Sequence, residues 1–366
     1  MKYYIIAGEA SGDLHGSNLM KGIVSEDRDA QFRFWGGDLM AAVGGFLVHH
    51  YREGAVMGAW EVLKKASTLY SNLRACKKDI LEWKPDVVIL IDYPGFNFRI
   101  AEFAHKAGFK VFYYIAPKVW ASREGRNRKL KKYVDKLFII FPFEVPYFSE
   151  KGLPFVYAGN PLLDAVDNHE YSKPSEVPYI AVLAGSRKAE ISRMMPVCME
   201  LADKLDCKLI VAGAPARSKE DYEGFIAGRK NVELVFDRTY DILKYAEAAV
   251  VNSGTASLEC ALIGTPQVVC WSTSRATMWV AKRILKVQKR ISFISLGNLI
   301  IGHQAFKELI QEDFNLPSLL EEVKRLRSDE DYRARMQSDY KEIRRLLGQS
   351  GASAAVAREM IKELSS

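Results

Sequence analysis

Long apolar runs are absent from this chain of 366 residues. A membrane-spanning helix needs about 18 or more consecutive apolar residues, and no such stretch occurs. Met1 and Lys2 also lead directly into a strand pattern, without the charged and apolar segments of a signal peptide. We therefore expect a cytoplasmic protein that does not cross a membrane.

Cysteines are few, and their spacing matches neither a metal site nor a disulfide framework. The five, an odd number, are Cys76, Cys198, Cys207, Cys260 and Cys270. In a cytoplasmic protein this pattern predicts reduced thiols that lie mostly in the core.

Charge of one sign is only slightly in excess. Lys and Arg number 52 against 45 Asp and Glu, a difference of +7. This surplus is small for a nucleic-acid-binding protein, but it suits anionic substrates or an anionic membrane face. No internal repeat occurs, and the length exceeds one ordinary core, so we expect two domains.

A β-α-β pattern organises the second half of the chain. Two apolar runs, Ala248 to Val251 and Gln267 to Cys270, flank a polar turn and a helix that Gly264 closes. Such a helix begins with free N–H groups and a positive dipole end, which favour a phosphate.

Four residues of this unit are candidates for donor binding: Ser253, Gly254, Thr255 and Glu259. The two hydroxyls can donate to a phosphate. Glu259 lies one helical turn after Thr255 on the same side, where a carboxylate can accept both hydroxyls of a ribose. A simpler interpretation is that Ser253 or Thr255 only caps the helix and that Glu259 is solvated.

A second anion-binding turn is predicted earlier in this half. The strand pattern Tyr179 to Leu183 is followed by Gly185, Ser186 and Arg187. An arginine in this place can bind a phosphate bidentately.

The first turn of the chain, Gly8 to Gly16, follows the strand pattern Lys2 to Ala7 and has a different character. It lacks the G-x-G-x-x-G spacing of dinucleotide-binding domains, and it carries Glu9 and Asp13, which would repel a phosphate. The turn suits a neutral ligand rich in hydroxyls. Alternatively, Asp13 only caps a helix.

Asp92 ends the apolar run Val87 to Ile91, which is typical of a central parallel strand buried on both faces. Open α/β sheets bind ligands at the carboxyl ends of such strands. We expect burial to raise the pKa of Asp92, which suits a general base. The alternative is a carboxylate that caps a turn.

The repeated strand patterns predict an α/β fold of two doubly wound Rossmann-like domains facing a central cleft. Further strands are expected at Phe32 to Gly37, Lys110 to Ile115, Lys136 to Ile140, Lys208 to Ala212 and Val232 to Phe236. A polar linker after Gly159 separates domain 1–162 from domain 163–349, and a last helix in 350–366 completes the first. The distribution of turns suggests a nucleotide on the second domain and a hydroxyl acceptor on the first.

Two segments indicate contact with a membrane or with acyl chains. Between Arg275 and Arg290 there are six basic residues and no acidic one, and helical spacing places Lys282 and Lys286 on one arc with Trp279. A locally apolar patch is formed by Val56, Met57, Trp60 and Leu63. The plainer interpretations are a solvated helix face and ordinary core.

Together these motifs resemble the lipid-A-disaccharide synthase family, in order from residue 2 to about residue 310. The matching segments are Gly8 to Asp13, Ala55 to Gly58 with Glu61 to Leu63, Ile91-Asp92 with Phe96-Asn97, Pro117 with Val119 to Ala121, Leu183 with Gly185 to Arg187 and Glu190, and Ser253 to Ala256 with Leu258 to Cys260.

The resemblance implies a GT-B glycosyltransferase of lipid A biosynthesis. Such enzymes join UDP-2,3-diacylglucosamine to 2,3-diacylglucosamine 1-phosphate, forming the β-1,6-linked disaccharide 1-phosphate and UDP. The resemblance implies no cofactor besides the donor. It also implies that Asn298 belongs to the UDP site.

Inverting transfer of this kind needs one base and no covalent sugar intermediate. Asp92 is the predicted base, with Glu9 and Asp13 orienting hydroxyls. Arg187 and the turn at Ser253 to Thr255 would offset the charge that develops on the leaving diphosphate.

No metal is expected, because the two Asp-x-Asp patterns, Asp27 to Asp29 and Asp329 to Asp331, lie in polar segments that flank helices. The expected partners are the two acylated glucosamines and the anionic face of the inner membrane, to which the protein would bind peripherally. No nucleic acid is expected, and a homodimer is left open.

Two other classes of function remain open. A UDP-sugar epimerase of the same architecture would act on a UDP-sugar without an acceptor. A non-enzymatic nucleotide- or RNA-binding protein would bind RNA with strong salt dependence.

Overall fold

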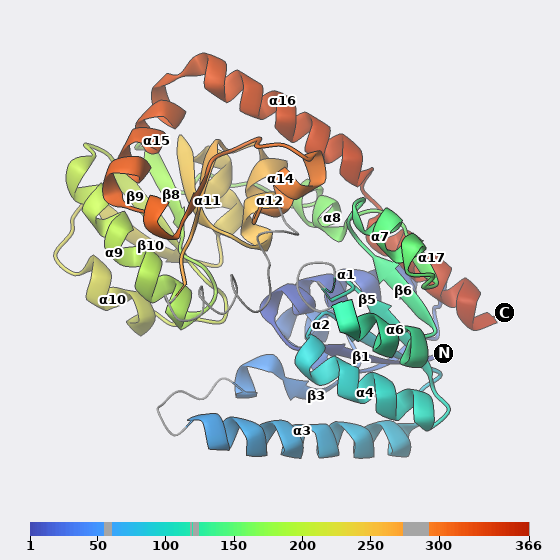
Figure 1. Cartoon of the computed structure of the whole chain (residues 1–366). Helices are drawn as coiled ribbons and strands as arrows, with labels where there is room; N and C mark the ends of the chain where they lie inside the picture. Colours follow the sequence, from blue (N-terminus) through green and yellow to red (C-terminus); the bar gives the residue numbers. More distant parts are fainter. Residues whose placement is uncertain (55–60, 118, 120–123, 274–292, 366) are drawn as a thin grey trace. The chain divides into compact units, whose positions relative to one another are not determined.

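The computed structural model describes residues 1–54, 61–117, 119, 124–273 and 293–365. The chain divides into two compact units, which we call unit 1 (Met1–Asp164 with Gln349–Ser366) and unit 2 (Ala165–Gly348). Each unit has its own parallel sheet covered by helices (Figure 1).

Unit 1 contains a seven-stranded parallel sheet in the order β3-β2-β1-β4-β5-β6-β7. Its strands are β1 (Lys2–Ala7), β2 (Gln31–Gly36), β3 (Phe46–His50), β4 (Val87–Ile91), β5 (Lys110–Tyr114), β6 (Lys136–Ile139) and β7 (Phe155–Tyr157). Every residue of β4 is buried, as expected for an apolar strand covered on both faces.

The helices of unit 1 follow the strands in alternation. They are α1 (Ala10–Glu26), α2 (Asp38–Val43), α3 (Glu61–Trp83), α4 (Pro94–Lys106), α6 (Asn127–Tyr133), α7 (Glu144–Glu150), α8 (Pro161–Asp167) at the border with unit 2, and α17 (Ala352–Ser365), with short 3-10 turns η1 (Tyr51–Gly54) and η2 (Glu124–Arg126). The segment expected to be a linker thus contains α8.

Unit 2 contains a six-stranded sheet in the order β10-β9-β8-β11-β12-β13, with every pair parallel. Its strands are β8 (Tyr179–Leu183), β9 (Lys208–Gly213), β10 (Val232–Phe236), β11 (Ala248–Asn252), β12 (Gln267–Trp271) and β13 (Glu308–Ile310). Its helices are α9 (Lys188–Lys204), α10 (Glu220–Ile226), α11 (Thr239–Tyr245), α12 (Thr255–Ile263), α14 (Leu296–Ile301), α15 (Leu316–Ser328) and α16 (Glu330–Leu347), with the 3-10 turn η4 (Gln311–Asp313).

The predicted fold class, two doubly wound Rossmann-like sheets, is confirmed. The predicted central strands are all present, with bounds that agree to within about one residue. The three strands that were not predicted, β3, β7 and β13, lie at sheet edges. Edge strands lack the continuous apolar run that marks a strand buried on both faces, so pattern alone misses them.

The C-terminal helix α17 packs on unit 1, as the red helix in Figure 1 shows. Asp164 caps it by accepting hydrogen bonds from the backbone N–H groups of Gly351 and Ser353, the latter at 2.9 Å. A Cβ at Gly22 of α1 would lie 2.9 Å from the Ser353 carbonyl oxygen, so glycine permits this close approach. Arg358 of α17 pairs with Glu26 at 3.3 Å.

Candidate active site

Each sheet has one point where the strand order reverses, and the predicted residues Glu9, Asp92, Arg187 and Ser253 follow strands at these points. In unit 1 the reversal lies between β1 and β4, and in unit 2 between β8 and β11. The turns that follow these strands start at Gly8, Asp92, Ala184 and Ser253. Open α/β sheets bind ligands at such switch points, because the helices on either side diverge and leave the strand ends accessible.

At the unit 1 switch point, the turns after β1 and β4 pack against each other. β1 and β4 pair in parallel, with Ala7 opposite Ile91. A Cβ at Gly8 would lie 2.4 Å from the ring of Tyr93, so only glycine allows the two turns to meet. Burial, followed by the nearby charge of Glu9, raises the pKa of Tyr93. The structure thus brings the Glu9 and Asp92 turns together.

Asp92 lies on a strained turn at the end of β4. Asp92 and Tyr93 have φ angles of 41° and 44°, in the left-handed region that non-glycine residues rarely adopt. Each such residue costs about 1 kcal/mol or more, and this kind of strain is concentrated at functional sites. The Asp92 side chain is exposed, whereas Ile91 is buried.

This exposure corrects one expectation. We predicted that burial of Asp92 would raise its pKa, but the left-handed turn carries the side chain out of the buried strand.

Asp13 caps a helix, as the alternative interpretation held, but the helix is α2 and not the one that follows the first turn. Asp13 is 2% exposed, and its carboxylate accepts hydrogen bonds from the backbone N–H groups of Gly37 (2.8 Å), Leu39 (3.1 Å) and Met40 (3.1 Å). These groups form the amino end of α2, so Asp13 caps a helix 24 residues away. The geometry favours a positioning role for Asp13. Glu9, at the start of α1, is exposed at the switch point.

In unit 2, the turn after β8 is shaped by Gly185 and filled by Glu190. Gly185 has a φ of +100°, and a Cβ there would lie 2.2 Å from the Asn252 side chain. The carboxylate of Glu190 accepts hydrogen bonds from the N–H groups of Ser186 (3.0 Å) and Arg187 (3.1 Å), and it pairs with the Arg187 guanidinium at 3.1 Å. A carboxylate therefore occupies the anion position of this turn, and a phosphate would compete with Glu190.

The turn after β11 is small and open. Gly254 is the N-cap residue of α12, and no side chain caps this helix. The Ser253 hydroxyl donates to the Ile294 carbonyl at 3.1 Å, so neither Ser253 nor Thr255 is the cap that the simpler interpretation assumed. A Cβ at Gly254 would meet nothing within 4 Å, which leaves space for a ligand to approach the backbone.

Glu259 is held by a residue that the sequence did not point to. It is half-buried on α12, and its carboxylate accepts a hydrogen bond from the Tyr240 hydroxyl at 2.9 Å. Burial raises the pKa of Glu259, and the bond from Tyr240 partly opposes this. No local pattern links the two residues, because they lie 19 positions apart on different helices.

Asn298 is not available as a ligand-binding side chain in this structure. It is fully buried, its Nδ2 donates to the Phe306 carbonyl (3.0 Å) and to Glu308 (2.9 Å), and its Oδ1 accepts from the Ala305 N–H (2.8 Å). Its amide thus holds the loop between α14 and β13. Its assignment to the UDP site is corrected to a positioning role, since these bonds use both ends of the amide.

A small cavity opens at the carboxyl edge of the unit 2 sheet. Its walls include Glu190, Asn252, Trp271 and Phe314. The cavity lies beside both predicted donor turns. Asn252 directly precedes Ser253 in one turn, and Glu190 accepts hydrogen bonds from the backbone of the other, the Gly185 turn.

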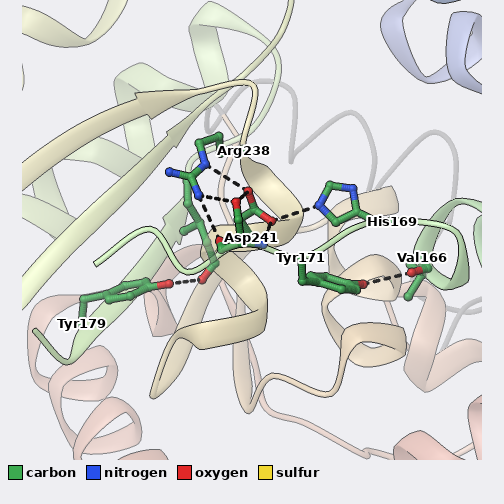
Figure 2. A network of polar contacts seen from close by, with 8 residues as sticks. Val166, His169, Tyr171, Tyr179, Arg238 and Asp241 are labelled. Carbon is green, nitrogen blue, oxygen red and sulfur yellow. Dashed lines mark hydrogen bonds and ion pairs between the residues drawn. The ribbon is translucent and has the colours of Figure 1, made fainter. Parts of the chain in front are cut away.

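A polar network in unit 2 fixes the segment that leads into β8 (Figure 2). Asp241, at 5% exposure, accepts hydrogen bonds from the Ser172 N–H (2.9 Å), from Arg238 Nε (3.0 Å) and from His169 Nε2 (3.1 Å). Burial alone would raise the pKa of Asp241, but hydrogen bonds from Ser172, His169 and Arg238 outweigh it and lower the pKa to about 2.

Asp241 should make the protein sensitive to acid. Because its folded pKa is depressed, the carboxylate stabilises the fold above about pH 4, by about 2 kcal/mol, and this contribution is lost as the pH falls towards about 2. We expect Asp241→Asn to lower the free energy of unfolding by a similar amount at pH 7 and to flatten its dependence on pH below about 4. Urea unfolding between about pH 2 and 7 measures both quantities. A variant with the same pH dependence as the wild type would contradict the assignment.

Several predicted site residues lie outside the described residues. These are Val56, Met57, Trp60, Trp279, Lys282 and Lys286. Leu63 belongs to the first turn of α3.

Among the described residues, no helix is long and apolar enough to span a bilayer. Within the same residues, no group of three or more His, Cys, Asp or Glu side chains has the arrangement of a metal site. The two Asp-x-Asp patterns are helix-flanking, since Asp27 and Asp329 are cap residues of α1 and α16.

Comparison with known proteins decides the family. The family model described as lipid-A-disaccharide synthetase matches residues 3–362. The chain belongs to this family. It is 34% identical to the lipid-A-disaccharide synthase of Trichlorobacter lovleyi, covering 96% of this chain and 95% of that protein. It is 35% identical to the enzyme of the same name from Geobacter metallireducens, covering 98% and 96%.

Solved structures support the fold. A UDP-GlcNAc 2-epimerase from Neisseria meningitidis bound to UDP-GlcNAc aligns with a TM-score of 0.69 at 12% identity, covering 99% of this chain and all of that one. A calicheamicin glycosyltransferase aligns with a TM-score of 0.60 at 16% identity, covering 100% and 98%. At such identities the likeness concerns the GT-B fold alone. Family membership makes the chain a glycosyltransferase of lipid A biosynthesis, and the epimerase and RNA-binding interpretations are not favoured.

Proposed function

We propose that unit 2 binds the donor, UDP-2,3-diacylglucosamine, and that unit 1 binds the acceptor, 2,3-diacylglucosamine 1-phosphate. The observation that carries this division is the chemistry of the two switch points. Exposed carboxylates, Glu9 and Asp92, lie at the switch point of unit 1. The switch point of unit 2 presents the exposed Arg187 and the amino end of α12 at Gly254, which no side chain caps. Neutral hydroxyls suit the first set, and a diphosphate suits the second.

The reaction proposed is an inverting transfer. The 6-hydroxyl of the acceptor attacks the anomeric carbon of the donor, its proton passes to the Asp92 carboxylate, and the bond to UDP breaks with UDP as the leaving group. Arg187 and the amino end of α12 at Gly254 offset the charge that develops on the diphosphate. Glu259 accepts from ribose hydroxyls, with Tyr240 holding its carboxylate. No metal or further cofactor takes part in the proposal.

Product analysis tests this function directly. Mass spectrometry after mixing the protein with both acylated substrates should reveal a disaccharide 1-phosphate and an equal amount of UDP. The donor alone should remain unchanged. Formation of an epimeric UDP-sugar without acceptor would instead favour the epimerase class.

We also propose that the protein is cytoplasmic and binds peripherally to an anionic inner membrane. Acyl chains keep both substrates in the bilayer, because each buried CH₂ contributes roughly 0.8 kcal/mol. On unit 1, α6 carries four exposed basic residues and no acidic one, which supports an anionic partner: Arg128, Lys129, Lys131 and Lys132. The segment Arg275 to Arg290 has the same character in sequence.

Vesicle binding tests the membrane proposal. We expect the protein to co-sediment with vesicles that contain phosphatidylglycerol, and this binding to weaken with salt, because each basic residue near the surface contributes about 1 kcal/mol. Changing Lys282, Lys286 and Lys289 to Glu should reduce it, with little change for neutral vesicles.

A matched control separates this surface from overall charge. Changing the exposed Lys204, Lys230 and Lys324 of unit 2 to Glu alters the net charge equally and should leave co-sedimentation unchanged. Binding that is insensitive to salt, or equal losses in both triple variants, would argue against a defined membrane face.

A further inference from the structure

The turn that presents Asp92 is held in place by two fully buried side chains, Asn97 of α4 and Tyr113 of β5. The Asn97 Nδ2 donates to the carbonyl oxygens of Ile91 at 3.2 Å and Asp92 at 2.9 Å. The Tyr113 hydroxyl donates to the same Asp92 oxygen at 2.6 Å. The Asp92 carbonyl therefore accepts from two side chains that come from different elements.

The other side of the peptide is also fixed. The Asp92 N–H donates to the Tyr114 carbonyl at 3.2 Å, which extends the β4–β5 pairing by one bond. Tyr93 stacks on Phe96 with ring centroids 5.5 Å apart and covers Gly8. Two successive residues in the left-handed conformation are strained, and they keep this conformation only when surrounding contacts hold it in place.

A simple helix cap would not need this arrangement. If β4 continued in extended form, residue 92 would point to one of the two faces that helices cover, because side chains alternate along a strand. The left-handed turn leaves the Asp92 side chain exposed at the sheet edge instead. The bonds from Asn97 and Tyr113 therefore fix the backbone from which this carboxylate extends.

We propose that Asn97 and Tyr113 are positioning residues for the transfer reaction, which hold the Asp92 carboxylate at the place where it meets the acceptor hydroxyl. The inference rests on the proposed role of Asp92 as base. Neither side chain reaches solvent, so neither touches substrate itself. Small misplacements of a catalytic group lower turnover more than substrate binding.

Tyr113→Phe tests the inference with the least disturbance, since it removes one hydroxyl and keeps the ring. We expect turnover to fall on the order of tenfold, with the KM for acceptor and the affinity for UDP nearly unchanged. Asn97→Asp, which keeps the shape but removes both donated bonds, should lower turnover further. Tyr114→Phe is the matched control, because Tyr114 is the next residue of β5, is equally buried, and its hydroxyl makes no hydrogen bond to the Asp92 turn.

A double-mutant cycle with Asp92→Asn separates this inference from the proposed function. If Tyr113 acts through Asp92, Tyr113→Phe should cost nothing more once Asp92 is Asn. The inference would be overturned, with Asp92 still the base, if folded Tyr113→Phe had wild-type turnover. It would also be overturned if Tyr113→Phe lowered turnover by the same factor in the wild type and in Asp92→Asn. Wild-type turnover of Asp92→Asn would overturn the base assignment and this inference together. If Tyr113→Phe or Asn97→Asp lowers turnover only in proportion to lost folded protein, the residues are structural and the inference also fails.

Discussion

Asp92→Asn is expected to lower turnover on the order of a hundredfold or more, while folding and UDP affinity stay as in the wild type. Asparagine has nearly the same shape, and the turn at Asp92 is held through its backbone, so the strained conformation should survive. Only the ability to accept a proton is lost. Turnover is measured by release of UDP at saturating concentrations of both substrates.

The control for this variant is Asp29→Asn, which changes an exposed carboxylate elsewhere in unit 1. It should leave turnover unchanged. Near wild-type turnover of Asp92→Asn would remove Asp92 from the mechanism. Glu9, the other exposed carboxylate at this switch point, would then be the next candidate.

Arg187→Ala and Glu259→Ala should each weaken UDP binding, by roughly tenfold to a hundredfold, because a charged hydrogen-bonding group contributes about 1.5–3 kcal/mol. The Arg187 guanidinium is largely exposed and pairs with Glu190 at 3.1 Å, at a surface that a diphosphate can reach. Glu259 is presented to the ribose by Tyr240. Calorimetric titration with UDP measures both affinities.

Arg193→Ala is the matched control, since Arg193 is an exposed arginine on the same helix, α9. Its loss should not change UDP affinity. Unchanged affinity in both the Arg187 and the Glu259 variants would show that the donor site lies elsewhere. A selective loss in only one of them would assign either the diphosphate or the ribose contact.

Much of the fold was predictable because its signals are local. β4 and β8 are runs of five residues that are buried throughout, and such runs have few interpretations besides a central parallel strand. The turn after β8 is also marked in the sequence, because a glycine such as Gly185 adopts a positive φ without strain. The left-handed turn after β4 has no such glycine, since it is formed by Asp92 and Tyr93. The edge strands β3, β7 and β13 were missed because they lack a continuous run of buried apolar residues.

The candidate site was predictable only in outline. Glu9, Asp13 and Asp92 look alike in sequence, each a carboxylate close to the end of a strand. In the structure Glu9 and Asp92 are exposed, whereas Asp13 is buried beneath α2. Asn298 similarly looked like a binding residue and proves to hold a loop.

The sequence alone determined where strands end and which polar residues follow them, and therefore the family, the fold class and the two switch points. Only the tertiary structure decided which of those polar groups are already engaged. Asp13 bonds Gly37, which is 24 residues away in the chain, and Glu259 bonds Tyr240, which is 19 residues away. The Asp92 carbonyl accepts from Tyr113, which is 21 residues away. Such contacts form when segments that are distant in the chain pack together. A buried polar group then bonds to the partner that this packing brings near, and a local sequence pattern does not show which partner that is.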